Sequence, residues 1–150
     1  MKSYELLDHT ADTGLKIYGR NLEELFLHGA LGLYSLMTDV EDIRAKTSRR
    51  SAPTYRGRQE QSIRLRAEGI EALFFDWLRE LLFHFSAHKR LFLEIRFQTL
   101  SETELDAACH GELFNAHHHR QRTEVKAVTL HQYYVRKTGD FWEAQVIFDI

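Results

Sequence analysis

The chain has 150 residues, of which 43% are hydrophobic and 28% charged, and its formal net charge is −2. A chain of this length and composition buries one hydrophobic core, so we predict a single globular domain over residues 1–150. Its one cysteine, Cys109, excludes an intramolecular disulfide and a thiolate metal cluster, and it favours a reducing compartment such as the cytoplasm. The charge balance argues against tight, direct binding of nucleic acid.

The first forty residues predict two short strands followed by a helix. Alternating apolar and polar residues indicate strands at 4–8 and 14–18, with the sequence DHTAD as the loop between them. Asn21 is a suitable N-cap, with Glu24 at the third helical position, and apolar residues at helical spacing continue to residue 37. We therefore expect a helix over 22–37.

The middle of the chain predicts an exposed connection, a strand and a long core helix. Residues 39–61 are polar and contain the only proline, Pro53, which is typical of a surface connection. Alternation over 63–67 indicates a strand with one buried face. Apolar residues then recur at three- and four-residue steps from Ile70 to Phe85, which predicts a helix buried on two faces.

The second half of the chain is rich in predicted strands. They cover 91–97, 104–114, 123–129, 133–137 and 142–148, with a hairpin turn at 138–140. Because the helices are few and the strands follow one another directly, we predict an α+β fold with two main helices packed on a mostly antiparallel sheet. No apolar run approaches the roughly 20 residues of a membrane-spanning helix, and the acidic N-terminal segment is unlike a signal peptide, so we expect no contact with a membrane.

Common enzymatic signatures are missing from the sequence, which has no phosphate-binding glycine loop, no Gly-x-Ser-x-Gly and no His-Glu-x-x-His. It does have the acidic DHTAD segment and the ending FDI. If the last strand lies beside the N-terminal strands, the carboxylates of Asp12 and Asp149 and the α-carboxylate of Ile150 could converge. Three hard oxygen ligands suit calcium, magnesium or manganese rather than zinc. The residues alone also allow Asp12 to cap a turn and Asp149 to be a solvated end residue.

Histidine and lysine residues give weaker indications. Adjacent side chains of an extended segment point to opposite sides, so the tract His117–His119 cannot easily converge on one metal, and a surface loop is favoured. Lys126 alternates with apolar neighbours and is predicted to face solvent from a strand. His9 either orients a ligand by hydrogen bonding or is a buried structural histidine.

Four stretches of the sequence, in order and at family-like separations, closely resemble the archease family. They are DHTADTGLKIYGRNLEELFLHGALGLYSLMTD, EGIEALFFDWLRELLF, TEVKAVTLH and VIFDI. The resemblance implies a divalent metal site formed by Asp12, Asp149 and the C-terminal carboxylate of Ile150, with calcium expected first and magnesium or manganese as alternatives. It also implies a functional role for Lys126 and a supporting one for His9. The segment FNAHHHRQR, residues 114–122, departs from the family, which usually has a proline there.

The resemblance implies a protein cofactor rather than an enzyme. Archeases assist an RtcB-type RNA ligase in tRNA splicing and RNA repair by promoting its guanylylation and multiple turnover, so tRNA would be met indirectly, through the ligase. A second hypothesis, also drawn from the family, is a chaperone for a tRNA-modifying methyltransferase, which would need exposed apolar surface. A metal-dependent phosphohydrolase using Asp12 and Asp149 is disfavoured, because no nucleophile or general base accompanies them.

Overall fold

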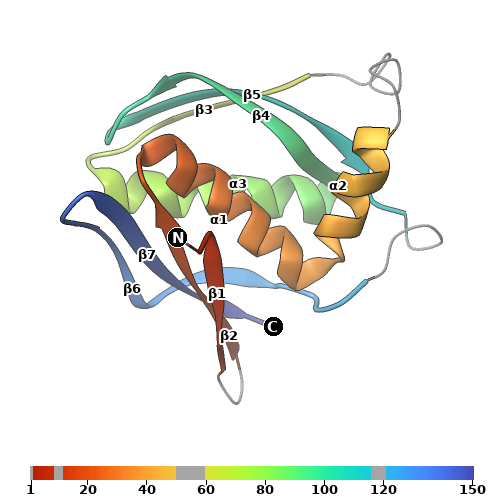
Figure 1. Cartoon of the computed structure of the whole chain (residues 1–150), viewed down its shortest axis with the longest axis horizontal. Coiled ribbons are helices and arrows are strands. Elements are labelled where there is room, and N and C mark those ends of the chain that lie inside the picture. The colour runs from red at the N-terminus through yellow and green to blue at the C-terminus, as the bar shows by residue number, and fades with distance from the viewer. Residues whose placement is uncertain (1, 9–11, 50–59, 116–120) are drawn as a thin grey trace.

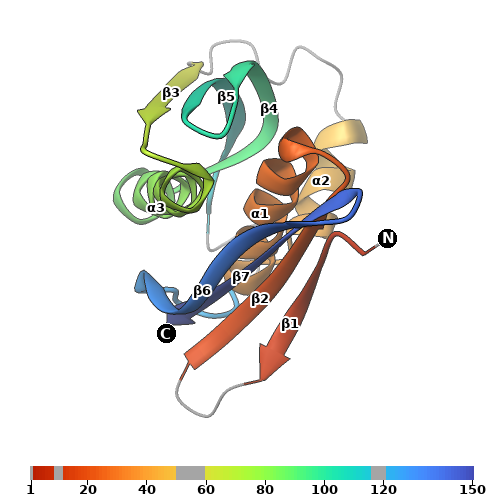
Figure 2. The same cartoon turned by 90° about the vertical axis from the view of Figure 1, so that its left-hand side faces the viewer.

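Two antiparallel sheets enclose a pair of long helices, which gives the molecule three layers (Figure 1, Figure 2). The computed structural model describes residues 2–8, 12–49, 60–115 and 121–150. The elements in chain order are β1 (Tyr4–Asp8), β2 (Asp12–Gly19), α1 (Leu22–Met37), α2 (Val40–Arg49), β3 (Gln61–Arg66), α3 (Ile70–His88), β4 (Arg90–Leu100), β5 (Glu104–Leu113), β6 (Ala127–Thr138) and β7 (Phe141–Asp149).

The first sheet has four strands in the order β1-β2-β7-β6, and each neighbouring pair is antiparallel. Alternate residues of its two central strands, among them Leu15, Ile17, Val146 and Phe148, are buried against the helices. A tight turn joins β6 to β7, and Gly139 takes a φ of 62° there, a left-handed conformation that glycine adopts without steric cost. The turn pairs Thr138 with Phe141 and so fixes the start of the β6–β7 register.

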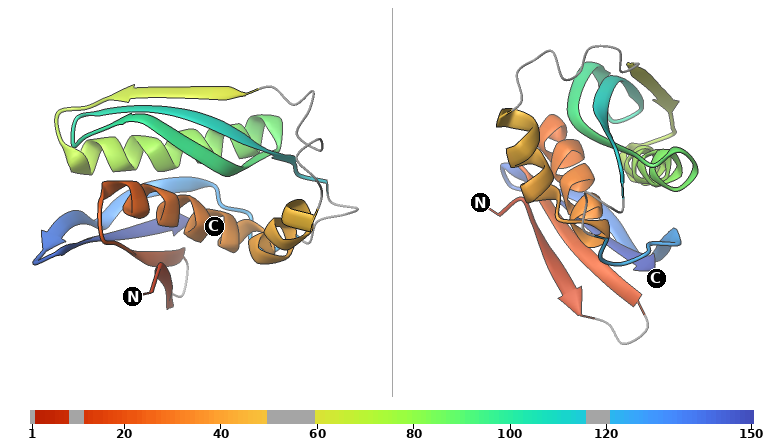
Figure 3. Two further views of the ribbon diagram at one scale, coloured as in Figure 1. Left: turned by 45° about the horizontal axis from the view of Figure 1, so that its top comes forward. Right: turned by 90° about the vertical axis from the view of Figure 1, so that its right-hand side faces the viewer.

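The second sheet has three strands in the order β3-β5-β4 and covers the other side of the helices (Figure 3). The β4–β5 pairing shifts register between Phe92 and Glu94 and again between Phe97 and Thr99. Gly111 lies at the first shift, where a Cβ atom would sit 1.5 Å from the carbonyl oxygen of Leu91. Only glycine allows the two strands to approach so closely.

Helix α1 is held to α3 and to β4 by hydrogen bonds inside the core. The Trp77 indole donates to the carbonyl oxygen of Phe26 at 2.9 Å. The Tyr34 hydroxyl accepts the N–H of Phe92 at 3.1 Å, at the register shift of β4. Burial raises the pKa of Tyr34 well above its ordinary value. These contacts connect the layers through polar groups that are each satisfied despite full burial.

The structure confirms the α+β class, the antiparallel pairing and the helix at 22–37, and it extends the second predicted helix to His88. The prediction that 39–61 is wholly an exposed connection is wrong, because 40–49 form α2. Asp39 accepts the N–H of Asp42 at 3.3 Å, and Val40 and Ile43 are buried one turn apart. This short amphipathic pattern is hidden by the polar composition around it.

Two further predictions need correction. The strands form two separate sheets rather than one, because the helices lie between them. The segments 123–129 and 133–137 are not separate strands: β6 runs from Ala127 to Thr138, with a register irregularity between Thr129 and Tyr134 where Gln132 has a φ of 51°. Residues 123–126 precede this strand. Among the described helices, none combines the length and the apolar character needed to cross a membrane.

Replacing Tyr34 with phenylalanine should lower the free energy of unfolding by about 1–3 kcal/mol, because the buried N–H of Phe92 would lose its acceptor. Urea denaturation followed by circular dichroism measures the change. Tyr18→Phe is the matched control, since it removes a hydroxyl that bonds Glu5 at the molecular surface and should cost less. Equal stability of both variants would contradict a structural role for the Tyr34 hydrogen bond.

Candidate metal-binding site

Asp12 and Asp149 come from opposite ends of the sequence and are direct neighbours in the first sheet. Asp12 begins β2, Asp149 ends β7, and the register of the two strands pairs these residues. Ala127, the first residue of β6, pairs with Asp149 from the other side. The site is therefore a row of three paired residues, one each from β2, β7 and β6. It lies at the end of these strands where the C-terminus is beside the start of β2 (Figure 2).

The two carboxylates point away from the helices. Along β2, Leu15 and Ile17 are buried against the core, so Asp12 lies in the alternate set with Lys16. Asp149 likewise alternates with the buried Phe148. Directly opposed residues of an antiparallel pair have Cβ atoms about 4.5–5.5 Å apart on the same face. The two carboxylates thus share one side of the sheet.

Main-chain contacts bring Lys126 to the same place. Its N–H donates to the carbonyl oxygen of Asp149 at 2.8 Å, although the residue itself precedes β6. The Lys126 side chain is exposed to solvent, as is Asp149, whereas Asp12 is partly buried and its Oδ1 atom is inaccessible. Ile150 follows Asp149 directly, and its side chain is 43% exposed. The main chain on both sides of Asp149 is thereby fixed next to Asp12.

This donor set suits a hard divalent cation. Like charges placed opposite each other across strands destabilise a sheet, and a cation between them would offset that repulsion. In the described parts of the chain, no three side chains of His, Cys, Asp or Glu gather into a metal-binding cluster. The pair therefore supplies two side-chain carboxylates, and the α-carboxylate of Ile150 or water molecules would supply further oxygen ligands.

Near the other end of β7, the carboxylate of Glu143 differs from that of Asp149 because neighbouring side chains donate hydrogen bonds to it. Glu143 accepts a hydrogen bond from the Tyr134 hydroxyl at 2.5 Å and one from Arg136 at 3.0 Å. These hydrogen bonds, with that from Tyr134 the largest effect, lower the pKa of Glu143. Burial and the neighbouring Glu143 raise the pKa of Tyr134 to about 12. Glu143 is already neutralised by its neighbours, which makes it a poor metal ligand beside the Asp12–Asp149 pair.

Sequence reasoning missed the Glu143 cluster, although a signal for it is present. The hairpin turn at 139–140 pairs Thr138 with Phe141, and counting back along the two strands puts Arg136 opposite Glu143. The guanidinium of Arg136 also lies over the Tyr134 ring, 4.4 Å from its centroid. The strand alternation and the turn were enough to predict the ion pair, but not that Tyr134 would share the same carboxylate oxygen.

Comparisons with known proteins place the chain in a family. The model of the Archease protein family (MTH1598/TM1083) matches residues 4–150. The chain belongs to the archease family. It is 35% identical to the protein archease of Methanosarcina barkeri over 99% of this chain and 97% of that one. It is 32% identical to the protein archease of Thermococcus kodakarensis, with all of both chains covered.

Two solved structures are similar to this one. The solution structure of Methanobacterium thermoautotrophicum protein 1598 superposes with a TM-score of 0.74 at 30% identity, and all of both chains are covered. The crystal structure of an archease, described as a possible chaperone, from Thermotoga maritima has a TM-score of 0.60 at 21% identity, covering 96% of this chain and 94% of that one. The second likeness concerns the fold alone.

The structure brings together some of the residues that the archease resemblance singles out. Asp12 and Asp149 are cross-strand partners, and Lys126 reaches them through its main chain. Asp12 lies within β2 rather than in a loop, which corrects the prediction that all of DHTAD connects two strands. His9 and the tract His117–His119 lie outside the described residues.

Replacing Asp149 with asparagine should leave the metal-free protein as stable as the parent, or more stable by up to ~1 kcal/mol, because the opposed charges are relieved. Calcium or manganese in excess should stabilise the parent and have a much smaller effect on the variant, since a ligand of the folded state raises its stability. Urea denaturation in EDTA and in each metal makes the comparison. Asp140→Asn, in the turn at the far end of the hairpin, changes the same charge and should respond to metal as the parent does. Equal metal stabilisation of the parent and Asp149→Asn would contradict the site.

Adding one glycine after Ile150 should weaken metal binding if the α-carboxylate is a ligand. The extension converts that anion into a neutral amide and moves the charge by about 3.3–3.6 Å without altering any side chain. Calorimetric titration of calcium and manganese into the parent and the extended protein at equal ionic strength measures the effect. Unchanged affinity in the extended protein would show that the α-carboxylate is not a ligand.

Proposed function

We propose that this chain is a metal-binding protein cofactor that activates an RtcB-type RNA ligase in the cytoplasm, promoting its guanylylation and multiple turnover in tRNA splicing and RNA repair. The observation that carries the proposal is the direct cross-strand pairing of Asp12 with Asp149. These are the two side chains for which the archease resemblance implies a metal. Membership of the archease family supports the proposal, because the whole chain apart from its first residues matches the family model.

The residues of this chain would act by binding a divalent cation and by placing it, with the charge of Lys126, at the active site of the ligase. Asp12 and Asp149, with the α-carboxylate of Ile150, would hold a divalent cation, calcium first and magnesium or manganese as alternatives. When bound, the cation would supply positive charge for phosphate oxygens at the ligase active site. The ammonium group of Lys126 is exposed near the same row and would reach a phosphate or an acidic group of the ligase. Covalent chemistry stays with the ligase.

A second candidate function is supported by apolar side chains at the surface. Leu6, Phe83, Leu113 and Leu130 are all more than half exposed. Exposed apolar surface is what a chaperone for a tRNA-modifying methyltransferase would use to contact its client. The chaperone role needs no metal, and this difference separates the two candidates.

Reconstitution with the RtcB-type ligase of the same organism tests the proposal. The parent should raise the rate of ligase guanylylation and allow repeated ligation, while the chain alone should neither join RNA nor hydrolyse GTP. Asp12→Ala should lower metal affinity and stimulation at least about tenfold, the scale seen when even a group that only supports a metal ligand is lost. Lys126→Ala should keep metal affinity and lose stimulation.

The readouts of this experiment are single-turnover guanylylation, multiple-turnover RNA joining and metal titration. Circular dichroism checks that each variant is folded. Stimulation that survives both EDTA and Asp12→Ala would contradict the metal-cofactor role and favour the chaperone. An effect of Lys126→Ala on metal affinity would instead place that side chain in the metal site.

A further inference from the structure

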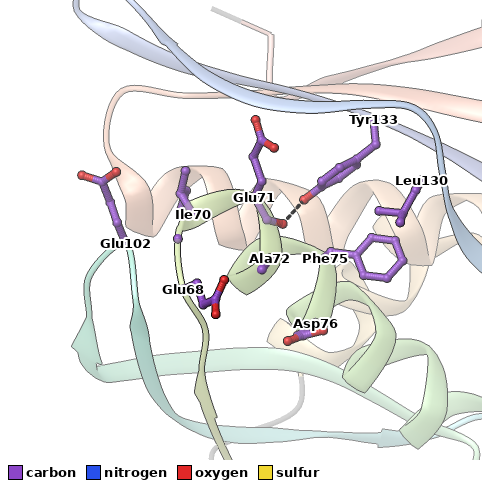
Figure 4. Close-up of a pocket in the computed structure, with 10 residues that line it drawn as sticks. Glu68, Ile70, Glu71, Ala72, Phe75, Asp76, Glu102, Leu130 and Tyr133 are labelled. Carbon is purple, nitrogen blue, oxygen red and sulfur yellow. Dashed lines mark hydrogen bonds between the residues drawn. The ribbon is translucent and has the colours of Figure 1, made fainter.

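Two adjoining pockets lie between α3 and β6. One pocket, of about 750 Å³, lies beside the N-terminal half of α3 and is bounded by β6 and by Glu102 (Figure 4). A second, of about 670 Å³, lies farther along α3 toward the beginning of β6. Phe75 and Leu130 line both pockets, so the two adjoin each other. We call the two adjoining pockets the α3–β6 groove.

The floor of the groove is preformed and apolar. The rings of Phe75 and Tyr133 meet edge to face with their centroids 5.5 Å apart. The Tyr133 hydroxyl donates to the carbonyl oxygen of Glu71 at 2.6 Å, which fixes β6 to the first turn of α3 (Figure 4). Burial raises the pKa of Tyr133 well above its ordinary value, so the hydroxyl keeps its proton. These contacts order the floor before a partner binds, which lowers the entropic cost of binding.

Exposed apolar side chains stand on both walls of the groove. Leu130 of β6 is 69% exposed and Phe83 of α3 is 54% exposed, and both line the second pocket. Side chains of this size gain free energy when a partner covers them. Two of them facing one preformed groove are typical of a protein-binding surface rather than of isolated exposed residues.

The two ends of the groove have opposite charge. Glu68, Glu71, Asp76 and Glu102 line the first pocket, and no Lys or Arg is among its lining residues. Arg79 and Lys126 line the second, and no Asp or Glu is among its lining residues. Asp76 and Arg79 approach each other to 4.0 Å at the middle of the groove and partly cancel. The first pocket still has an excess of acidic side chains, and the second still has Lys126. This difference in charge would orient a segment bound in the groove.

The Lys126 end reaches the candidate metal site. The second pocket is lined by Lys126 and Ala127, and Ala127 is the residue of β6 that pairs with Asp149. A segment lying in the groove with one end at the acidic pocket would therefore have its other end at Ala127, one strand away from Asp149, whose carboxylate lies on the face of the sheet that points away from the helices. Acidic side chains at the far pocket would repel phosphate, so RNA does not fit along the whole groove.

We propose that the α3–β6 groove binds a segment of the partner ligase whose apolar side chains cover Leu130 and Phe83 and whose basic side chains lie over Glu68 and Glu102. An acidic group of the same segment lies toward Lys126. This inference rests on the proposed function, because it names the ligase as the protein in the groove. Docking along the groove would bring the ligase to the end of the sheet where Ala127 pairs with Asp149, so affinity would come from the groove and activation from the carboxylates on the adjoining face.

Charge reversal at the acidic end tests the groove separately from the metal site. Glu68 and Glu102 are exposed, so the double variant Glu68→Lys/Glu102→Lys should fold. Titrated into the guanylylation assay, it should need about tenfold more protein for half-maximal stimulation, equivalent to about 1.4 kcal/mol, and reach the plateau of the parent. Asp149→Asn should instead lower the plateau. Glu41→Lys/Glu94→Lys is the charge-matched control on α2 and β4, and it should behave as the parent.

Photo-cross-linking identifies the occupant directly. A benzophenone amino acid in place of Leu130 should cross-link to the ligase, whereas the same group in place of Leu113, an equally exposed leucine at the end of β5, should not. Cross-linking to RNA alone from position 130, equal cross-linking from both positions, or an unchanged midpoint in Glu68→Lys/Glu102→Lys would overturn the groove inference while the proposed function stands. If the parent does not stimulate the ligase at all, the proposed function fails, and this inference fails with it.

Discussion

The register of β7 is the constraint on which the candidate site depends. β7 pairs with β2 on one side and with β6 on the other, so its alignment decides which residues of β2 and β6 lie opposite its own. Burial of Val146 and Phe148 on one face and the tight turn at Gly139 hold that alignment. A slip by one residue would turn the apolar set outward and separate Asp149 from Asp12, so the packing of the core and the geometry of the site cannot vary independently.

The two ends of β7 carry acids whose electrostatic surroundings differ. Glu143 shares an oxygen with Tyr134 and Arg136, and its charge is compensated within the protein. Asp149 instead faces a second carboxylate at the end where the strands finish. Two carboxylates that face each other favour an external cation, and this contrast supports Asp149 rather than Glu143 as a ligand.

The placement of the helices between the sheets leaves the α3–β6 groove, which we propose as a second functional surface. Helix α3 packs on the three-stranded sheet and on α1, and among the described residues its main contact with the four-stranded sheet is along β6. The side of α3 next to β6 is left partly open, and the groove forms there, with Phe75 and Tyr133 closing its floor. Because β6 also borders Asp149, the groove and the carboxylate pair are connected through one strand. The same strand, β6, can thus contribute both to the binding of a partner in the groove and to the position of the carboxylate pair.

The sequence by itself determined the elements whose signals are local. Apolar spacing and the Asn21 cap define α1, strand alternation and the glycine turn define the last hairpin, and the archease motifs select Asp12, Asp149 and Lys126. It did not reveal α2, whose amphipathic pattern is only a few residues long, or the division of the strands into two sheets. The tertiary structure alone decided that Asp12 pairs with Asp149 and that α3 lies beside β6. Such pairings join residues far apart in the chain, and they are fixed by the packing of the whole core rather than by any local preference.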